Sequence, residues 1–333
     1  MPEDLLSFYA DHFRPGAIDL SASCPPPVAL ECFAAGTPGP AELAFVPPSG
    51  AEKLREAIAA RYDCLGADDI RISSGASEGL VALAFATLRC GDCAWVAAGT
   101  YPSFIEAAGK VGARLARTPG IPPGTSVALA CNPTVPEGWI FDVRAFLHAC
   151  RQAGAIPVMD EVYRDLHAGA PLPSLADLNP SAVSIGDLSK PLGLGGVRIG
   201  WVATRDSELL ARIDRELQLL SGGPSSLSVT AAESAFESFD ETVAATMQAA
   251  LTNLPGIWAV LECHRWRVVP SQAGITVLAV PPHPLSPSAL ARLEDAGYFL
   301  LAAETIDAPG AYRISLLRDP GTLDRALDIL DSG

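Results

Sequence analysis

The sequence predicts an α/β protein, in which helices cover both faces of a mostly parallel sheet and a small α+β domain follows at the C-terminus. Short apolar runs alternate with segments of helical spacing, which is typical of βαβ units. The chain has 333 residues, of which 49% are hydrophobic and 18% charged, as expected for a packed globule with one large core or two domains. After residue 200 longer helical stretches replace the alternation, which indicates a second unit.

Residues 1–48 are rich in proline and small residues, and we expect an irregular arm that begins with a short helix. The large domain is expected over residues 49–225. Short apolar runs bounded by turn residues predict strands, and apolar residues three or four apart predict helices. The expected order is helix 52–62, strand 70–73, helix 80–88, strand 94–97, helix 104–111, strand 127–130, helix 143–152, strand 156–159 and strand 183–185.

Residues 226–333 are expected to form a linking helix and the small C-terminal domain. Before them, a helix over 206–220 has acidic residues in its first turn and ends at the Gly-Gly-Pro of 222–224. The linking helix covers 228 to about 254, where a proline follows. The remaining pattern predicts strand 274–280, helix 290–295, strand 311–317 and helix 323–330.

The composition excludes several kinds of partner. Lysine and arginine number 23 against 38 aspartate and glutamate, a formal net charge of −15, so nucleic acid and anionic membranes lack a broad cationic surface to bind. The longest uncharged runs, 242–261 and 268–291, contain proline, and the N-terminus lacks a signal-peptide pattern. We therefore expect no membrane span, a cytoplasmic location and reduced thiols. Cys90 and Cys93 have the spacing of a zinc or redox half-site without a second pair, so we expect turn residues and no metal.

A glycine-containing segment, 75–79 (Gly-Ala-Ser-Glu-Gly), follows an expected strand and opens an expected helix. Backbone N–H groups at such a turn bind phosphate well. The same pattern fits the nucleophile elbow of α/β-hydrolases, and Ser77, Asp160 and either His264 or His283 occur in the chain order of their triad. Because no oxyanion loop precedes it, a serine hydrolase with Ser77 is the less favoured alternative.

Lys190 stands among glycines after an expected strand, within 187–201 (Asp-Leu-Ser-Lys-Pro-Leu-Gly-Leu-Gly-Gly-Val-Arg-Ile-Gly-Trp). The chain has only two other lysines, Lys53 and Lys110, so a lysine in this setting is hard to explain as surface charge. A lysine that forms a Schiff base with an aldehyde cofactor must exchange protons readily.

Segment 187–201 resembles the lysine motif of the fold type I pyridoxal-phosphate enzymes, the aminotransferase class I/II family. Further motifs of this family occur in the same order, and the resemblance covers residues 45 to 317. These motifs are Tyr101-Pro102, Asn132-Pro133, Asp160-Glu161-Val162-Tyr163 and Tyr312-Arg313-Ile314-Ser315. The resemblance implies pyridoxal 5'-phosphate as cofactor and a homodimer with its active site near the subunit interface.

The resemblance also implies a role for each position. Lys190 forms the Schiff base and moves a proton, Asp160 at a strand end holds the ring nitrogen protonated, and Tyr101 stacks on the ring. Asn132 and Tyr163 hydrogen-bond the ring oxygen. The phosphate is bound by groups of Gly75, Ala76, Ser77, Ser189 and Arg198. The substrate lies against Arg313, which binds its carboxylate or otherwise forms an internal ion pair, and against Ser23 and Asn132.

These residues predict an enzyme that acts on a small amino acid through a Lys190 Schiff base and a quinonoid, in the simplest case an aminotransferase with a keto-acid acceptor. The same carbanion also serves elimination, replacement, decarboxylation or a cyclisation similar to that of capreomycidine synthase. A regulatory pyridoxal-phosphate-binding protein is less favoured, because only about 48 residues precede the fold and contain no basic helix-turn-helix.

Three positions depart from the family pattern. Asp187 stands where a phosphate-binding Ser or Thr is usual, and a carboxylate there repels a dianion, so we expect it to point elsewhere or to be hydrogen-bonded, leaving Ser189 as the hydroxyl donor. Phe45 replaces a Tyr that reaches the neighbouring subunit's phosphate. Ser23 replaces a Gly beside the substrate. These departures favour a specialised reaction without weakening the expectation of the cofactor.

Overall fold

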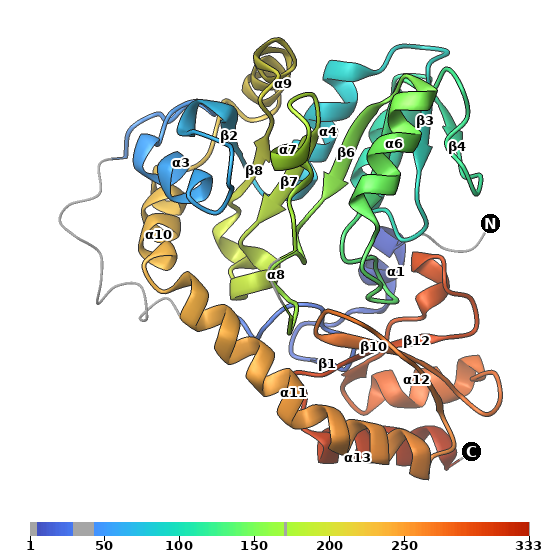
Figure 1. Ribbon diagram of the computed structural model, residues 1–333. Helices are drawn as coiled ribbons and strands as arrows, with labels where there is room; N and C mark the ends of the chain where they lie inside the picture. Colours follow the sequence, from blue (N-terminus) through green and yellow to red (C-terminus); the bar gives the residue numbers. More distant parts are fainter. Residues whose placement is uncertain (1–4, 29–42, 170–171, 333) are drawn as a thin grey trace.

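The computed structural model describes residues 5–28, 43–169 and 172–332. A larger domain is built on a seven-stranded sheet and a smaller one on a three-stranded sheet (Figure 1). The large sheet has the strand order β2-β8-β7-β6-β5-β3-β4, and only β8 runs antiparallel to its neighbours. Its strands are β2 Ile70–Ser73, β3 Cys93–Val96, β4 Arg114–Ala116, β5 Val127–Cys131, β6 Ile156–Asp160, β7 Val183–Asp187 and β8 Gly200–Ala203. The predicted mostly parallel α/β sheet with a smaller domain is confirmed.

Helices cover both faces of this sheet, because alternate strand residues point to opposite sides. Val127 and Leu129 of β5 pack in the cluster with α4, α5 and α9, whereas Ala128 and Ala130 pack in the cluster with α6. The helices are α3 Glu52–Ala59, α4 Ala76–Thr87, α5 Pro102–Lys110, α6 Val143–Ala153, α7 Leu175–Leu178, α8 Ser189–Leu192 and α9 Ser207–Leu220, with 3-10 turns at Ala67–Asp69 and Gly195–Val197.

The linking segment forms two helices, where the sequence predicts one. The turn at Glu237 and Ser238 separates α10 (Ser226–Phe236) from α11 (Phe239–Cys263). The helix α11 continues past Pro255 because its C-terminal half packs on the small domain through buried Ile257 and Leu261. Figure 1 shows α11 running from the large domain down to α13.

The small domain consists of an antiparallel sheet of order β12-β10-β9 covered by helices. A side chain at Gly256 of α11 would come within 2.7 Å of Pro320, so the glycine allows α13 to approach closely. The elements are β9 Arg267–Val269, β10 Thr276–Val280, α12 Pro287–Asp295, β11 Tyr298–Phe299, a 3-10 turn at Ala303–Ile306, β12 Tyr312–Ser315 and α13 Pro320–Asp331.

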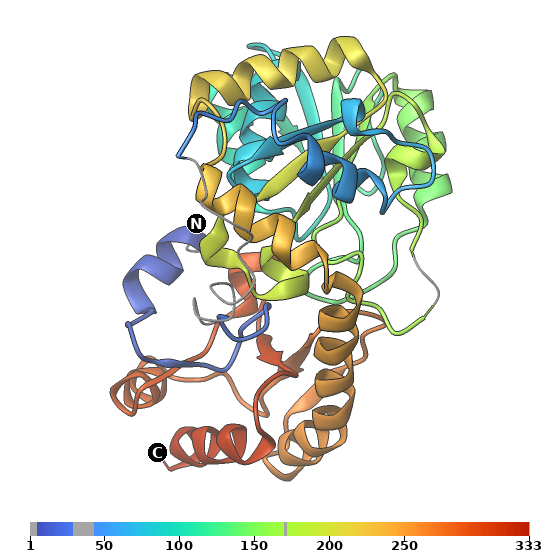
Figure 2. The same cartoon turned by 90° about the vertical axis from the view of Figure 1, so that its left-hand side faces the viewer.

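The N-terminal elements pack on this small domain. Strand β1 (Ile18–Asp19) pairs in parallel with β11, and Leu20 lies in the small-domain core. Helix α1 (Leu5–His12) lies at the level where the two domains meet, as the two views in Figures 1 and 2 show. The N-terminal segment therefore contributes side chains to the region between the domains.

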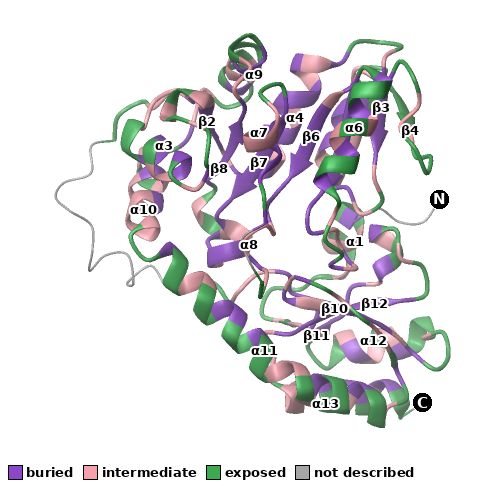
Figure 3. Cartoon of the chain, in the orientation of Figure 1, coloured by how far each residue is buried: buried purple, intermediate pink, exposed green. Residues whose placement is uncertain are grey.

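Buried residues are concentrated in the strands of the two sheets, whereas the outward faces of the helices are exposed (Figure 3). In the ranges the structure describes, no helix is long and apolar enough to cross a membrane. Strands β4, β8 and β9 are absent from the sequence-based expectation. Strands β4 and β9 have three residues each and no buried residue, so they lack the apolar run that predicts a strand. Strand β8 is buried and apolar, but it follows the Gly-rich segment 193–196 and Arg198, and its first residues are part of the lysine motif.

Candidate active site

The carboxyl ends of β5, β6 and β7 meet at one edge of the large sheet, where open α/β sheets bind ligands. Cys131 is opposite Asp160 across β5 and β6, and Asp160 is opposite Ile185 across β6 and β7. The loops that leave these strand ends carry Asn132, Tyr163 and Lys190. The fold thus brings these predicted residues to one edge of the sheet.

Lys190 lies in the one-turn helix α8, directly after β7, and is half-buried. Its Nζ lies 3.4 Å from the hydroxyl of Ser23 and 5.8 Å from the ring centre of Tyr163. Burial lowers the pKa of the Lys190 ammonium, but the acidic groups of Tyr163 and Asp187 outweigh it, so the pKa is raised. In the protein alone this lysine is therefore a cation surrounded by acidic groups.

Asp160 is a buried carboxylate with one spare oxygen. Its Oδ1 accepts the N–H of Val162 at 3.2 Å, and Oδ2 has no partner among the described residues. Burial and the charge of Asp187 raise the pKa of Asp160 to about 7. A carboxyl of this kind suits a protonated ring nitrogen, since an adjacent cation would relieve the cost of its burial. Asp160 is therefore suited to bind the nitrogen of a pyridine ring.

The N-terminus of α4 and the side chain of Arg198 form an anion cradle. Gly75 precedes α4 with φ +90°, and a side chain there would come within 2.3 Å of Arg198 Nη2. Arg198 donates to the carbonyl of Ser74 at 2.8 Å, which holds its guanidinium beside the helix start. Backbone N–H groups at Ala76 and Ser77, the Ser77 hydroxyl and this guanidinium suit a phosphate.

Strand β8 lies directly against the start of α4, because its first residue, Gly200, has no side chain. A side chain at Gly200 would come within 2.5 Å of the Ala76 backbone nitrogen. The Gly-Trp that follows Arg198 in the sequence therefore lets the strand pass directly behind the helix start. This close approach accounts for the glycine in the lysine motif.

Asp187 ends β7 and accepts the backbone N–H and the hydroxyl of Ser189, at 3.0 and 2.6 Å. Its carboxylate is therefore hydrogen-bonded within its own turn. The Ser189 hydroxyl also donates to Asp187, so a phosphate-binding role for Ser189 requires that this bond be exchanged and stays a prediction.

The groups predicted beside the ring differ in their exposure. Asn132 is buried and its Oδ1 accepts the N–H of Phe141 at 2.8 Å, which leaves its Nδ2 as the atom able to donate. Tyr163 is half-buried and lines a narrow cavity between the domains, together with Val135. Tyr101 precedes α5 and is 36% exposed. Their contacts to a cofactor stay predictions.

Arg313 is a buried cation on β12 without an acidic partner at ion-pair distance among the described residues. Its Nε donates to the carbonyl of Ser21 at 2.7 Å and its Nη2 to the hydroxyl of Tyr9 at 3.1 Å. The alternative of an internal ion pair is thus not seen in this part of the chain. Because an unpaired buried cation is costly, Arg313 suits a carboxylate ligand.

Tyr9 and Ser21 belong to the site although the sequence analysis did not find them. They precede Arg313 by about 300 positions, and no local pattern links them to it. Ser23, in contrast, is a residue that the sequence analysis named; it is buried and its hydroxyl lies 3.4 Å from Lys190 Nζ, while its contact with a substrate stays a prediction. Phe45 is 77% exposed and lies near Gly222, at the far end of α9.

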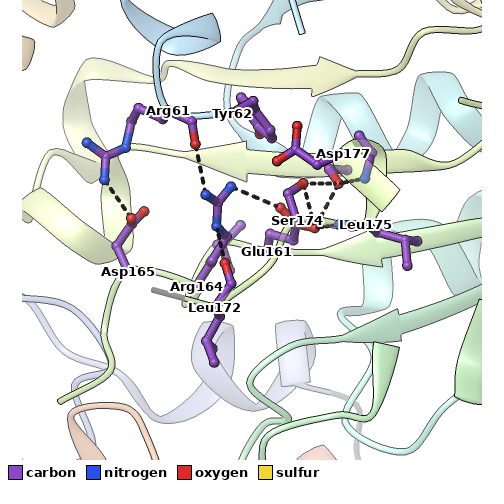
Figure 4. A network of polar contacts seen from close by, with 12 residues as sticks. Arg61, Tyr62, Glu161, Arg164, Asp165, Leu172, Ser174, Leu175 and Asp177 are labelled. Carbon is purple, nitrogen blue, oxygen red and sulfur yellow. Dashed lines mark hydrogen bonds and ion pairs between the residues drawn. The ribbon is translucent and has the colours of Figure 1, made fainter. Parts of the chain in front are cut away.

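Glu161, which follows Asp160, is buried behind the site (Figure 4). Its Oε1 accepts the N–H of Leu175 at 2.7 Å and the hydroxyls of Ser184 and Ser174 at 2.7 and 3.1 Å. Its Oε2 forms an ion pair with Arg164 Nη1 at 3.6 Å. Burial raises the pKa of Glu161, and the charge of Arg164 counteracts the rise.

Arg164 extends this network to neighbouring loops. It donates to the carbonyls of Arg61 and Leu172, at 2.8 and 3.1 Å, and Arg61 in turn pairs with Asp165 at 2.7 Å. Figure 4 shows these polar contacts, which hold the turn of Glu161, Arg164 and Asp165.

The rival hydrolase triad is not assembled. His264 ends α11, and its two ring nitrogens contact Asp331 and Asp324 of α13, at 2.7 and 3.0 Å. His283 is exposed on the small domain. Ser77, in contrast, belongs to the first turn of α4. Over the described ranges, no group of His, Cys, Asp or Glu residues is arranged to hold a metal.

Comparisons with known proteins agree with this geometry. Residues 20–330 match the sequence profile of the family described as aminotransferase class I and II. Histidinol-phosphate aminotransferase 1 of Mesorhizobium japonicum is 30% identical over 189 residues, 50% of this chain and 51% of that protein. The chain thus spans about half the length of the first curated relatives it matches.

Solved structures resemble nearly the whole chain. The PLP-dependent cyclase OrfR, in complex with Au, has a TM-score of 0.87 at 25% identity, covering 99% of this chain and 96% of that one. A double mutant of Thermus thermophilus aspartate aminotransferase has a TM-score of 0.84 at 19% identity, again covering 99% and 96%, a likeness that shows the fold.

Proposed function

Since the chain belongs to the aminotransferase class I and II family, we propose that it is a pyridoxal-phosphate (PLP) enzyme that acts on a small amino acid, in the first instance as an aminotransferase. The observation that supports this most is the setting of Lys190. It follows β7 at the sheet edge where Asp160 ends β6, and its pKa responds to Asp187 and to Arg313. One amino group therefore lies within electrostatic range of both acidic groups and a buried arginine.

The residues fit the cofactor from both ends. The α4 cradle with Arg198 suits its phosphate, and the spare oxygen of Asp160 suits its ring nitrogen. When bound, PLP supplies an aldehyde that takes up an amino group and a ring that withdraws electrons from the substrate. Lys190 is the residue that would hold this aldehyde, through its Nζ.

The protein's own groups then have separate tasks. Arg313 orients the substrate through its carboxylate, so that the α-carbon faces Lys190. Lys190 Nζ would act as the base that removes the substrate α-proton and as the acid that returns a proton. Asp160 Oδ2 would hold the ring nitrogen of the cofactor in its protonated form.

A cyclisation is the second candidate function, because the similarity to the PLP-dependent cyclase OrfR extends over 99% of the chain at 25% identity. Asp187 supports a cyclisation as well, since this additional buried carboxylate raises the pKa of both Lys190 and Asp160. In a cyclase the activated substrate is attacked by its own side chain, and no keto acid is consumed.

We further propose a homodimer in the cytoplasm. Exposed apolar side chains gather at the end of α9 and the start of α10, where Phe45 also lies near Gly222, and they suit burial against a second copy. They include Leu219, Leu220, Leu227 and Phe45. The seven described cysteines are free thiols, which supports a reducing compartment.

Borohydride trapping tests the cofactor, and substrate turnover tests the reaction. The purified protein incubated with PLP should gain a visible absorbance that borohydride abolishes, with a cofactor adduct on the Lys190 peptide by mass spectrometry. Lys190→Ala should give neither, and the same adduct on another lysine would contradict the proposal. The protein is then incubated with a panel of amino acids. Without a keto acid, at most one substrate molecule should be consumed per bound cofactor, whereas with a keto acid the turnover should be repeated. Repeated turnover without an acceptor would instead support the cyclase.

A further inference from the structure

Helix α1 brings Tyr9 to the buried arginine of the small domain. The Tyr9 ring packs on the ring of Phe299, with ring centres 5.0 Å apart. Phe8 and Phe13 also pack on the Phe299 ring, at 5.9 and 5.5 Å between ring centres. These aromatic contacts fix the direction of the tyrosine, so that its hydroxyl meets Arg313 Nη2 at 3.1 Å. Tyr9 is half-buried there, between the two domains.

The hydrogen bonds leave the Tyr9 proton without an acceptor. Arg313 has only N–H donors, so in this contact the Tyr9 oxygen accepts and its own O–H must point elsewhere. Within the described residues no group accepts that proton. Arg313 likewise donates one guanidinium N–H to Ser21 and one to Tyr9, and its remaining guanidinium N–H groups have no hydrogen-bond partner among the described residues. A phenol O–H and guanidinium N–H groups therefore converge without an acceptor of their own.

Electrostatic coupling indicates that the hydroxyl belongs to the same site as Lys190. Burial raises the pKa of Tyr9, the charge of Arg313 lowers it and that of Asp19 raises it, and Lys190 and Tyr163 contribute less. The net rise means that Tyr9 keeps its proton at neutral pH and remains a donor. An anion is the acceptor that such a pair of donors favours.

We propose that Tyr9 is a substrate-binding residue, whose hydroxyl donates to the same carboxylate that Arg313 binds. The inference rests on the proposed function and adds to it a receptor made from two distant parts of the chain. The aromatic packing on Phe299 positions the phenol, and the Arg313 contact directs its proton away from the guanidinium. The substrate carboxylate thus receives one neutral and one cationic donor.

The experiment compares Tyr9→Phe with Arg313→Leu in the PLP-loaded protein. Propionate serves as a probe that carries a carboxylate but no amino group, and its binding is followed by the absorbance of the bound cofactor. Tyr9→Phe keeps the ring contacts and should weaken propionate binding about 10- to 100-fold, the effect of losing a hydrogen bond to a charged group. With the best amino acid of the panel, KM should rise by a similar factor while kcat changes little. Tyr298→Phe removes a hydroxyl from the adjacent strand β11 and should change neither value.

The outcomes separate this inference from the proposed function. If Arg313→Leu abolishes propionate binding and Tyr9→Phe leaves it unchanged, the inference on Tyr9 is wrong and the carboxylate receptor stands. If neither variant changes binding, or wild type binds no propionate, the receptor itself is wrong. A fall in melting temperature of Tyr9→Phe with equal losses of propionate and PLP binding would indicate a merely structural role and would also overturn the inference.

Discussion

Asp187 accepts two hydrogen bonds from Ser189, one from its backbone N–H at 3.0 Å and one from its hydroxyl at 2.6 Å. A buried carboxylate is thus satisfied within the turn that carries Lys190. It also acts on its neighbours, because its charge raises the pKa of both Asp160 and Lys190. Asp187 therefore raises the proton affinity of two groups that the proposed reaction uses, in addition to the effects of burial and of Tyr163.

Removal of this charge should lower both pKa values. In Asp187→Asn the carboxylate no longer stabilises the protonated forms of Asp160 and Lys190, and the repulsion of a phosphate also falls. We expect PLP to bind roughly threefold to tenfold more tightly, with the pH transition of its absorbance moved to lower pH. Spectroscopic titration of the holoprotein measures both. Asp63→Asn, at an exposed position, should leave them unchanged; an unshifted transition in Asp187→Asn would contradict the assignment.

Asp160 should make the stability of the cofactor-free protein depend on pH. Its folded pKa, about 7, lies above the ordinary value of 3.8 because of burial, so the folded state binds the proton more tightly. Its stabilising effect is complete below pH 3.8 and is lost as pH rises to about 7, by at most about 1.4 kcal/mol per pH unit. Urea unfolding of the cofactor-free protein at several pH values measures this slope. Asp160→Asn should flatten it and, with PLP, lower kcat about 100-fold or more; an unchanged slope would show that Asp160 keeps an ordinary pKa.

The sequence predicts the strand ends of the site well but not the contacts between them. Apolar runs and Gly-rich turns locate Asp160 and Lys190, because strand ends and helix starts follow from local patterns. The bond between Ser189 and Asp187 depends on side-chain direction, which no pattern specifies. Tyr9 and Arg313 meet only because α1 packs on Phe299, a contact between segments at opposite ends of the chain. Pro255 likewise reads as a helix end, yet tertiary packing carries α11 beyond it.

Gly75 should not tolerate a side chain. Its φ of +90° is strained for other residues, and a Cβ would come within 2.3 Å of Arg198 Nη2. Gly75→Ala should therefore lower the free energy of unfolding by about 1–3 kcal/mol and displace Arg198 from the cradle. Equilibrium dialysis with PLP should show weaker binding, whereas Gly120→Ala, where a Cβ meets nothing within 4 Å, should bind normally. Equal behaviour of the two variants would count against the cradle.

Removing one member of the Glu161–Arg164 ion pair should destabilise the protein more than removing both charges. Glu161 is buried, and Arg164 is its cationic partner among the described residues. Arg164→Met leaves an unpaired buried carboxylate, which typically costs about 3–5 kcal/mol, whereas the double variant Glu161→Gln, Arg164→Met removes both charges and should regain much of that loss. Chemical denaturation of the four proteins of this double-mutant cycle measures the coupling. Additive losses would mean that the two charges do not stabilise each other.

His264 should tie α13 to α11 only while it is protonated. Its ring nitrogens contact Asp331 at 2.7 Å and Asp324 at 3.0 Å, so both nitrogens must donate. Burial lowers the pKa of His264, but the two aspartates outweigh it and raise the pKa above 6.5. The stabilising effect is therefore complete below pH 6.5 and is lost as pH rises through the raised value. Melting temperatures measured from pH 5 to pH 9 should fall over this window by a few degrees in wild type and stay flatter in His264→Gln. The exposed His283→Gln should behave as wild type, and a wild-type profile for His264→Gln would refute the clamp.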